Sequence, residues 1–309
     1  MRLGFTVPLF GTDAGPDALQ AVARQAEDLG YDSLWVFERL LYPVNPKAPY
    51  PATADGSLPL IYRRSLDPLA ILAYLAAATS RVRIGTTIIN LPFYNPVLLA
   101  RELGTIDVLS HGRLDLGLGV GWSPDEFEAV GVPMGDRGRR AEEALQVIEA
   151  IWRDNPVEFE GSYFRVPESY FDLKPVQKPR PPIYMAAYTP AAMNRIARMA
   201  DGWNPVGIPV GGMEQMFAGI KQAAAEAGRD PSKLKLIVTA NVEFHQAPLG
   251  DERPIFVGSA EQIESDIVAT RQLGADELIF NALFSPDVES TEDLLSHMKQ
   301  LRTMAHQSE

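Results

Sequence analysis

The sequence predicts an α/β protein, and more specifically a closed (β/α)8 TIM barrel. Eight segments typical of strands alternate with eight segments typical of helices, and this alternation requires a parallel sheet because each helix returns the chain to the edge where the next strand begins. Eight repeats within 309 residues favour a closed barrel over an open doubly wound sheet. No change in composition marks a linker, so we expect a single domain over residues 1–309.

Short β-branched and apolar runs predict the strands. They cover residues 2–7, 33–37, 83–89, 113–119, 182–187, 202–206, 234–242 and 277–280. Apolar residues at helical spacing predict the helices between them. These cover residues 15–30, 66–79, 95–111, 136–152, 190–200, 213–227, 260–273 and 291–304.

Two of these helices have clear end signals. Pro16 opens the first, and Gly30 is well placed as the left-handed residue that ends it. Asn95 and Pro96 form an N-cap followed by a proline at the first helical position. These signals support the order of strands and helices in the first half of the chain.

We expect excursions from the barrel after strands two and four. Residues 40–66 are rich in Pro, Tyr, Asn and Gly, and connections of this length are commonly functional or disordered. Residues 157–166 have the pattern of a hairpin around Gly161.

The charge and residue counts exclude several classes of protein. The chain has 28 Lys and Arg and 40 Asp and Glu, a formal charge of −12, which argues against binding to nucleic acid or an anionic membrane because both need a basic surface. Cys is absent, which excludes disulfides and thiolate catalysis. Without a leader-like start or an apolar run of roughly 18–20 residues, we expect a cytoplasmic protein with a small-molecule substrate.

The glycine-rich stretch after the fourth predicted strand is not a dinucleotide fingerprint. It reads Gly-Leu-Gly-Val-Gly-Trp, so Trp122 stands where G-x-G-x-x-G has its third glycine. We interpret Gly117 and Gly119 as small residues that packing inside the barrel requires. Gly121, at the end of the strand, is a position where backbone can approach a ligand closely.

Signatures of common hydrolases and metal enzymes are also missing. There is no G-x-S-x-G motif and no Walker A loop. The histidines are spread over separate elements and are expected in turns or on the surface, so no metal site is expected. They are His111, His245, His297 and His306.

Aromatic and polar side chains gather where the predicted strands end. In a (β/α)8 barrel this end carries the active site, and so many rings favour a pocket for a flat, conjugated ligand. The alternative is that about half of them simply pack beneath the loops. The set comprises Trp35, Phe37, Glu38, Tyr42, Tyr50, Tyr62, Phe93, Tyr94, Trp122, Phe127, Tyr188 and Thr189.

A long combined pattern carries a family resemblance. Residues 85–92 read Gly-Thr-Thr-Ile-Ile-Asn-Leu-Pro, and residues 107–122 read Asp-Val-Leu-Ser-His-Gly-Arg-Leu-Asp-Leu-Gly-Leu-Gly-Val-Gly-Trp. Residues 182–190 and 200–203 fit the same pattern with Pro-Ile-Tyr-Met-Ala-Ala-Tyr-Thr-Pro and Ala-Asp-Gly-Trp. Over nearly its whole length the chain resembles the bacterial luciferase-like monooxygenase superfamily, and within it the branch that uses coenzyme F420, a deazaflavin.

The resemblance implies a cofactor site at the strand ends. It implies a non-proline cis peptide at Thr87–Ile88, in a bulge against the deazaflavin ring. Amides near the start of the helix at 190 would meet the cofactor phosphate, where free N–H groups point outward. The implied cofactor-binding residues are Glu38, Thr86, Thr87, Ile88, Asn90, Gly121, Trp122, Ala186, Ala187, Tyr188 and Thr189.

Three departures separate this chain from the sugar-phosphate dehydrogenases of that branch. Those enzymes have Asp-His after strand two, with a catalytic His, where this chain has Glu38 and Arg39. They have Thr-Gly-Glu where residues 122–124 read Trp-Ser-Pro, and relatives often have Gly-Gly where this chain has Tyr188 and Thr189. We therefore do not expect glucose-6-phosphate dehydrogenase activity.

We expect hydride transfer between the deazaflavin and a small, apolar or conjugated organic substrate. Glu38 is the expected catalytic residue, which would orient or protonate a group; its structural alternative is an ion pair with Arg39, Arg63 or Arg64. An FMN-dependent monooxygenase and a non-catalytic F420-binding or flavin-binding protein are the alternative functions.

Two further features are left open by the sequence. Arg137, Arg139 and Arg140 cluster at a predicted helix start and form either a solvated face or a contact for the acidic tail of F420. Family members are often homodimers, but the sequence marks no interface.

Overall fold

The strands form a closed parallel barrel in the computed structural model, which describes residues 1–53 and 55–307. The sheet order is β3, β2, β1, β13, β10, β9, β8, β5 and β4, and a further pairing of β3 with β5 closes the ring. Since β3 and β4 are two halves of one barrel strand, the described chain confirms the predicted eight-stranded barrel. The strands are β1 (Arg2–Thr6), β2 (Ser33–Val36), β3 (Arg83–Thr86), β4 (Ile89–Asn90), β5 (Leu114–Gly119), β8 (Ile183–Met185), β9 (Gly202–Trp203), β10 (Lys235–Asn241) and β13 (Glu277–Asn281).

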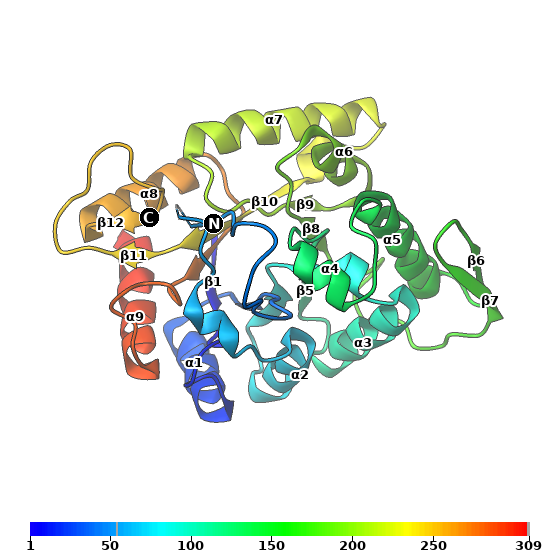
Figure 1. The fold of residues 1–309 in the computed structure, drawn as a ribbon, viewed down its shortest axis with the longest axis horizontal. Coiled ribbons are helices and arrows are strands. Elements are labelled where there is room, and N and C mark those ends of the chain that lie inside the picture. Colours follow the sequence, from blue (N-terminus) through cyan, green and yellow to red (C-terminus); the bar gives the residue numbers. More distant parts are fainter. Residues whose placement is uncertain (54, 308–309) are drawn as a thin grey trace.

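The helices form a ring around these strands (Figure 1). The expected end signals are present, since Gly30 has φ 71° and the Asn95 side chain accepts hydrogen bonds from the amides of Val97 and Leu98. The barrel helices are α1 (Pro16–Leu29), α2 (Pro68–Ala78), α3 (Pro96–Leu109), α5 (Arg137–Arg153), α6 (Pro190–Met199), α7 (Val210–Glu226), α8 (Ala260–Gln272) and α9 (Thr291–Gln307).

The third barrel strand is interrupted between β3 and β4. The interruption consists of Thr87 and Ile88, which are half-buried and joined by a cis peptide bond at the implied position. The Thr87 amide donates to the Val36 carbonyl (2.6 Å), and the Ile88 carbonyl accepts from the Glu38 amide (3.0 Å). Both bonds tie the interruption to the end of β2.

Both predicted excursions are present, together with a short helix that was not predicted. The long segment after β2 is present and contains the short helix η1 (Leu60–Arg63). The predicted hairpin is also present, as β6 (Val157–Glu160) and β7 (Arg165–Ser169), and projects at the right edge of Figure 1. It follows α5, as the predicted ranges of the helix and the hairpin required. The segment directly after β5 also holds a short helix, α4 (Pro124–Ala129).

Three small elements, two strands and a helix, were not predicted. Strands β11 (Glu243–Phe244) and β12 (Val257–Gly258) pair in parallel after β10, and α4 has only six residues. Elements this short contain too few residues for a period in hydrophobicity to appear.

The barrel interior holds one residue that was expected at the rim. Trp35 is 1% exposed and packs with Tyr184, Ile237 and Ile279. It lies within β2 rather than after it, so its side chain points into the barrel instead of toward the loops.

His297 is also placed differently from its expected surface position. It is 6% exposed, its ring lies 5.0 Å from that of Phe244, and Nε2 lies 3.0 Å from an Asp287 carboxylate oxygen. It therefore belongs to the packed side of α9.

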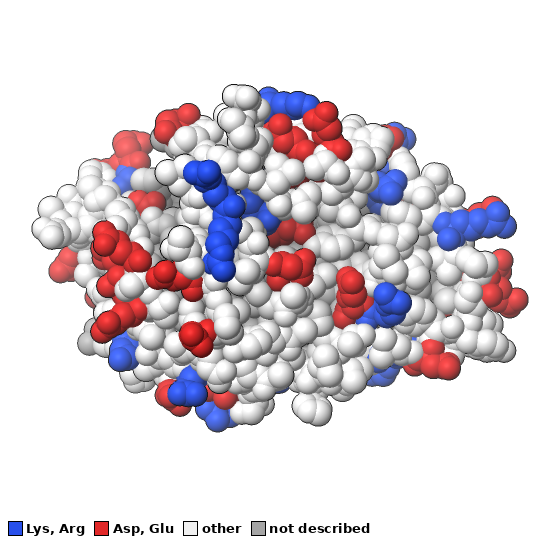
Figure 2. All heavy atoms as spheres, turned by 60° about the horizontal axis from the view of Figure 1, so that its bottom comes forward, with Lys and Arg blue, Asp and Glu red and all other residues white. Residues whose placement is uncertain are grey.

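Charged side chains are scattered over the face of the molecule that Figure 2 draws. On the face in Figure 2, acidic and basic groups are interspersed on a mostly uncharged surface, without a broad basic area. In the described part of the chain, no helix has both the length and the apolarity that crossing a membrane requires.

Candidate active site

Glu38 forms a hydrogen-bonded cluster with Asn90 and Tyr94 just beyond the end of β2. Its Oε2 accepts from the backbone amide of Asn90 (2.7 Å) and from the Asn90 side-chain Nδ2 (2.9 Å). Its Oε1 accepts from the Tyr94 hydroxyl. Because the Glu38 amide also holds the Ile88 carbonyl, the structure brings together four of the predicted site residues: Glu38, Thr87, Ile88 and Asn90.

The surroundings of Glu38 change its acidity. Burial raises the pKa of Glu38 to about 7, against the hydrogen bonds from Tyr94 and Asn90, which favour the carboxylate. Burial and the adjacent Glu38 carboxylate raise the pKa of Tyr94 above its usual value, so its phenol stays protonated at neutral pH. A carboxyl group with a pKa near neutrality is suited to give or accept a proton.

The proposed structural alternative for Glu38, an ion pair with a nearby arginine, is wrong. Arg39 pairs instead with Glu126 of α4, with 3.2 Å between Nη1 and Oε1. Arg64 donates to backbone carbonyls of residues 11–14. Within the described chain, Glu38 is held by neutral donors only.

The glycines of β5 make room for the interrupted third strand. A Cβ at Gly117 would overlap the Thr86 carbonyl oxygen, and one at Gly119 would overlap the end of the Ile88 side chain. Thr86 Oγ1 also donates to the Gly117 carbonyl (2.7 Å) and accepts from its amide (2.9 Å). The packing interpretation of these two glycines is therefore confirmed, while Gly121 has φ 76°, which glycine adopts at little cost.

Trp122 lies beside Arg39 in an aromatic group. The Arg39 Cζ lies 5.0 Å from the Trp122 ring centre, 5.3 Å from that of Tyr62 and 5.9 Å from that of Tyr50. Tyr62 is buried, whereas Tyr50 and Trp122 are half-buried. Phe127 is buried too, so part of the predicted aromatic rim packs beneath the loops.

The predicted phosphate-binding amides stand at the start of α6. The Ala186 amide donates to the Leu118 carbonyl (3.3 Å), so it is already used within the barrel. Among the described residues, no acceptor is found for the amides of Ala187, Tyr188 and Thr189. These three remain available as donors, and the Thr189 side chain caps the helix.

The three arginines at the start of α5 differ in their exposure and in their partners. Arg139 is exposed and forms an ion pair with Asp136 (2.6 Å), which agrees with a solvated face. Arg137 and Arg140 are half-buried, and the Nε atom of each is buried without a hydrogen-bond partner in the described structure.

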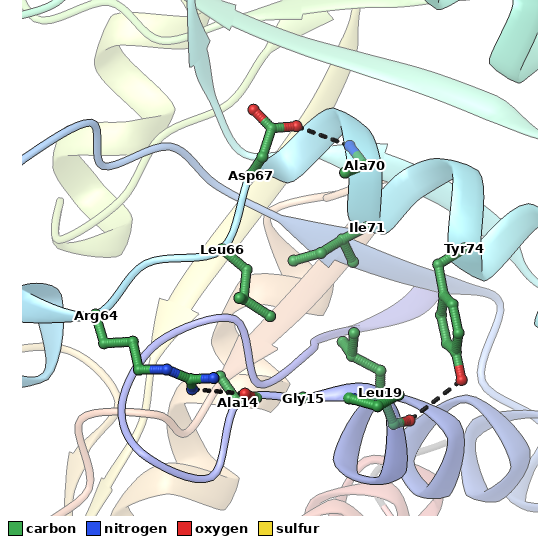
Figure 3. Close-up of a pocket in the computed structure, with 10 residues that line it drawn as sticks. Ala14, Gly15, Leu19, Arg64, Leu66, Asp67, Ala70, Ile71 and Tyr74 are labelled. Carbon is green, nitrogen blue, oxygen red and sulfur yellow. Dashed lines mark hydrogen bonds between the residues drawn. The ribbon is translucent and has the colours of Figure 1, made fainter.

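A hollow of about 320 Å³ lies outside the barrel, between the starts of α1 and α2 (Figure 3). Its polar side chains are engaged in the fold: Arg64 donates to the Ala14 carbonyl (2.6 Å), and Asp67 accepts from the Ala70 amide (2.8 Å). Its lining includes none of the predicted site residues. We therefore place the candidate site at the strand ends.

Sequence reasoning missed two pairings in this site. Tyr94 was named only as one of many aromatic residues, although its position four residues after Asn90 could have suggested a common partner. The pairing of Arg39 with Glu126 joins segments 87 residues apart and has no local sequence signal.

A family model described as luciferase-like monooxygenase matches residues 1–248. The chain belongs to this family. The uncharacterized protein Rv0953c of Mycobacterium tuberculosis is 38% identical over 196 residues, which cover 63% of this chain and 69% of that protein.

Two solved structures share the barrel fold of this chain. Monooxygenase RslO1 from Streptomyces bottropensis superimposes with a TM-score of 0.78 at 22% identity, covering 99% of both chains. An F420-dependent secondary alcohol dehydrogenase in complex with an F420-acetone adduct has a TM-score of 0.77 at 20% identity, covering 98% of both chains. At these identities the likeness concerns the fold.

Proposed function

We propose that this member of the luciferase-like monooxygenase family is an F420-dependent oxidoreductase that acts on a small, conjugated organic substrate. The observation that carries the proposal is the Glu38 carboxyl group, held by Asn90 and Tyr94 beside the interrupted third strand. The F420-dependent dehydrogenase with the same fold supports the choice of cofactor, as does the sequence pattern of residues 85–122.

The described residues fit an anionic cofactor of this kind. Three amides without acceptors, those of Ala187, Tyr188 and Thr189, stand at a helix N-terminus, which favours a phosphate group. The start of α5 adds two buried guanidinium nitrogens without partners. These belong to Arg137 and Arg140, and α5 and α6 are linked by an ion pair between Glu142 and Arg195 (3.1 Å).

The residues around the bulge would position the ring and manage protons. When bound, the deazaflavin supplies or accepts a hydride and reacts poorly with oxygen. In reduction of a carbonyl substrate, the hydride adds to carbon and the oxygen needs a proton. Glu38 would give that proton, and the hydrogen bonds from Tyr94 and Asn90 would stabilise the carboxylate left behind.

Cofactor titration tests this proposal directly. Purified protein is titrated with F420 and with FMN, following cofactor fluorescence, and reduced F420 is then used in a turnover screen against conjugated ketones, enones and quinones. We expect tight F420 binding and oxidation of reduced F420 that depends on an added acceptor. Tight binding of FMN with none of F420 would reject the proposal, and F420 binding without turnover across the screen would favour a binding protein.

The second candidate is an FMN-dependent monooxygenase of the same fold. It is favoured by the fold likeness to monooxygenase RslO1. In that case reduced FMN would be the tightly bound form, and substrate-dependent oxygen consumption would replace oxidation of F420.

A further inference from the structure

Arg39 is a buried cation whose one polar contact among the described residues is the ion pair of its Nη1 with the Glu126 carboxylate (3.2 Å). Its side chain is 7% exposed, and no hydrogen bond from it is found among the described residues. Nε and Nη1 are fully buried without a hydrogen-bond partner in the described structure. Because buried polar groups are nearly always satisfied, donors left free at a candidate site point to a ligand.

Two other arginines, Arg113 and Arg229, behave in the opposite way. Arg113 donates to the carbonyls of Ala76, Thr79 and Val82. Arg229 likewise donates to three carbonyls at the end of α6. An arginine that only held the loop after β2 in place would be expected to bond the backbone as these do. Arg39 does not, which argues against a purely structural role.

The Arg39 guanidinium is held by an ion pair and by aromatic rings rather than by hydrogen bonds. The Glu126 carboxylate lies 3.2 Å from Nη1, and its Oε1 accepts from the Leu40 amide (2.9 Å). The faces of aromatic rings attract a cation without hydrogen-bonding it, and three rings lie within 6 Å of Cζ. The guanidinium is therefore held by one ion pair, at Nη1, and by aromatic rings, without a hydrogen bond among the described residues.

The location of Arg39 is next to the proposed reaction centre. It follows Glu38 directly after β2, and its aromatic neighbour Trp122 follows directly after β5. The third strand, with the Thr87–Ile88 interruption, lies between β2 and β5 in the barrel. A molecule that contacts Arg39 would therefore be close to Glu38 and to the proposed ring position.

We propose that Arg39 binds an anionic oxygen of the substrate, and that the substrate is a conjugated molecule carrying a carboxylate or an ionised hydroxyl group. A planar guanidinium offers paired N–H donors that match a carboxylate. The half-buried rings of Tyr50 and Trp122 provide flat apolar surface beside it. This inference rests on the proposed function for the position of the substrate and adds its chemical class.

A pair of probes with the same shape and different charge tests the inference. 2-Naphthoate and its neutral isostere 2-naphthamide are titrated into the F420-loaded protein by calorimetry at pH 7.5. We expect the wild type to bind naphthoate at least tenfold more tightly than naphthamide. In Arg39→Gln this preference should disappear through a loss of naphthoate affinity, with naphthamide affinity unchanged within about threefold. Equal affinities in the wild type, or an unchanged preference in Arg39→Gln, would overturn the inference.

Matched variants separate recognition by Arg39 from a general effect of lost positive charge. Arg139→Gln removes an exposed arginine that pairs with Asp136 and should retain the full preference for naphthoate. Arg39→Lys keeps the charge without the planar fork and should bind naphthoate with intermediate affinity, which also carries the test if Arg39→Gln fails to fold. If Arg39→Lys bound naphthoate as tightly as the wild type does, recognition by the guanidinium would be contradicted.

F420 titrations of the same variants separate this inference from the proposed function. F420 binding should change by less than about threefold in Arg39→Gln. A selective loss of F420 binding would identify the cofactor as the partner of Arg39 and overturn the substrate assignment. Absence of F420 binding in the wild type would instead reject the proposed function, and the naphthoate preference of the unloaded protein would still decide the role of Arg39.

Discussion

At the scale of single residues, the chemistry of the candidate site centres on one carboxyl group. Burial raises the pKa of Glu38 to about 7, so near neutral pH it exists in both protonation states. If protonated Glu38 supplies the proton in substrate reduction, the rate should fall as the pH rises through about 7. Glu38→Gln should lower kcat/KM on the order of 100-fold and remove this pH dependence, as measured with reduced F420 between pH 5.5 and 8.5.

The control for this variant is Glu168→Gln, which changes an exposed glutamate on β7. It should retain the rate and pH profile of the wild type. Glu38→Gln should also bind F420 nearly as tightly as the wild type, since the amide keeps the size of the side chain. Full turnover of Glu38→Gln at every pH would show that Glu38 transfers no proton.

Tyr94 provides a second test at the same scale. Its hydroxyl donates to Glu38 and thereby stabilises the carboxylate. Tyr94→Phe removes this donor, so the pKa of Glu38 should rise further and the decline in reduction rate should occur at a higher pH. A pH–rate profile measures the shift, and an unchanged midpoint would mean that Tyr94 does not influence the ionisation of Glu38.

At the scale of elements, the site depends on how β5 accommodates the third strand. A Cβ at Gly117 would meet the backbone carbonyl of Thr86, whereas one at Gly119 would meet the flexible end of the Ile88 side chain. Gly117→Ala should therefore lower the free energy of unfolding by about 1–3 kcal/mol, as overpacking commonly does. Gly119→Ala should cost less stability and weaken F420 binding instead, because Ile88 must move.

Urea unfolding and F420 titration measure the two effects separately. Gly219→Ala is the control, since this glycine lies in α7 with nothing within 4 Å of an added Cβ; it should be neutral or stabilising by up to about 1 kcal/mol. Equal losses of stability in Gly117→Ala and Gly119→Ala would contradict the distinction between backbone and side-chain contacts.

At the scale of the whole molecule, regular elements could be predicted from the sequence and long-range contacts could not. Strand and helix patterns repeat locally, so the barrel and the end signals at Gly30 and Asn95 could be read from neighbouring residues. Contacts such as that of Arg39 with Glu126 join segments that are far apart in the sequence. Whether an aromatic ring lies at the rim or inside the barrel, where Trp35 lies, depends on the residue at which a strand ends.

The closure of the barrel also relies on one buried group that the sequence did not mark. Glu277 of β13 is fully buried. It accepts hydrogen bonds from Ser33 and from Trp35 Nε1 (3.0 Å) in β2, and it lies 2.6 Å from Arg2 of β1. Its carboxyl group thus joins the last strand of the barrel to the first two.

Removing this carboxyl group should destabilise the whole barrel. In Glu277→Ala, Ser33 and Trp35 lose a shared acceptor and Arg2 loses its ion-pair partner, and we expect the free energy of unfolding to fall by about 2–3 kcal/mol. The expected loss of stability is smaller than is usual when a buried ion pair is broken, because the Arg2 side chain is 37% exposed and solvent screens its charge. The control is Glu214→Ala at an exposed position of α7, which should change stability by less than about 0.5 kcal/mol.

The loss should also depend on pH in a defined direction. Burial raises the pKa of Glu277 from 4.5 to about 7, with Arg2 acting against it. Between these two values the folded protein binds more protons than the unfolded chain, so the contribution of Glu277 to stability is fully present below pH 4.5 and declines as the pH rises toward 7. Urea unfolding of the wild type and Glu277→Ala from pH 4.5 to 7.5 should give a difference that shrinks with rising pH. A difference that grows with pH would mean that the ion pair with Arg2, rather than burial, controls the ionisation of Glu277.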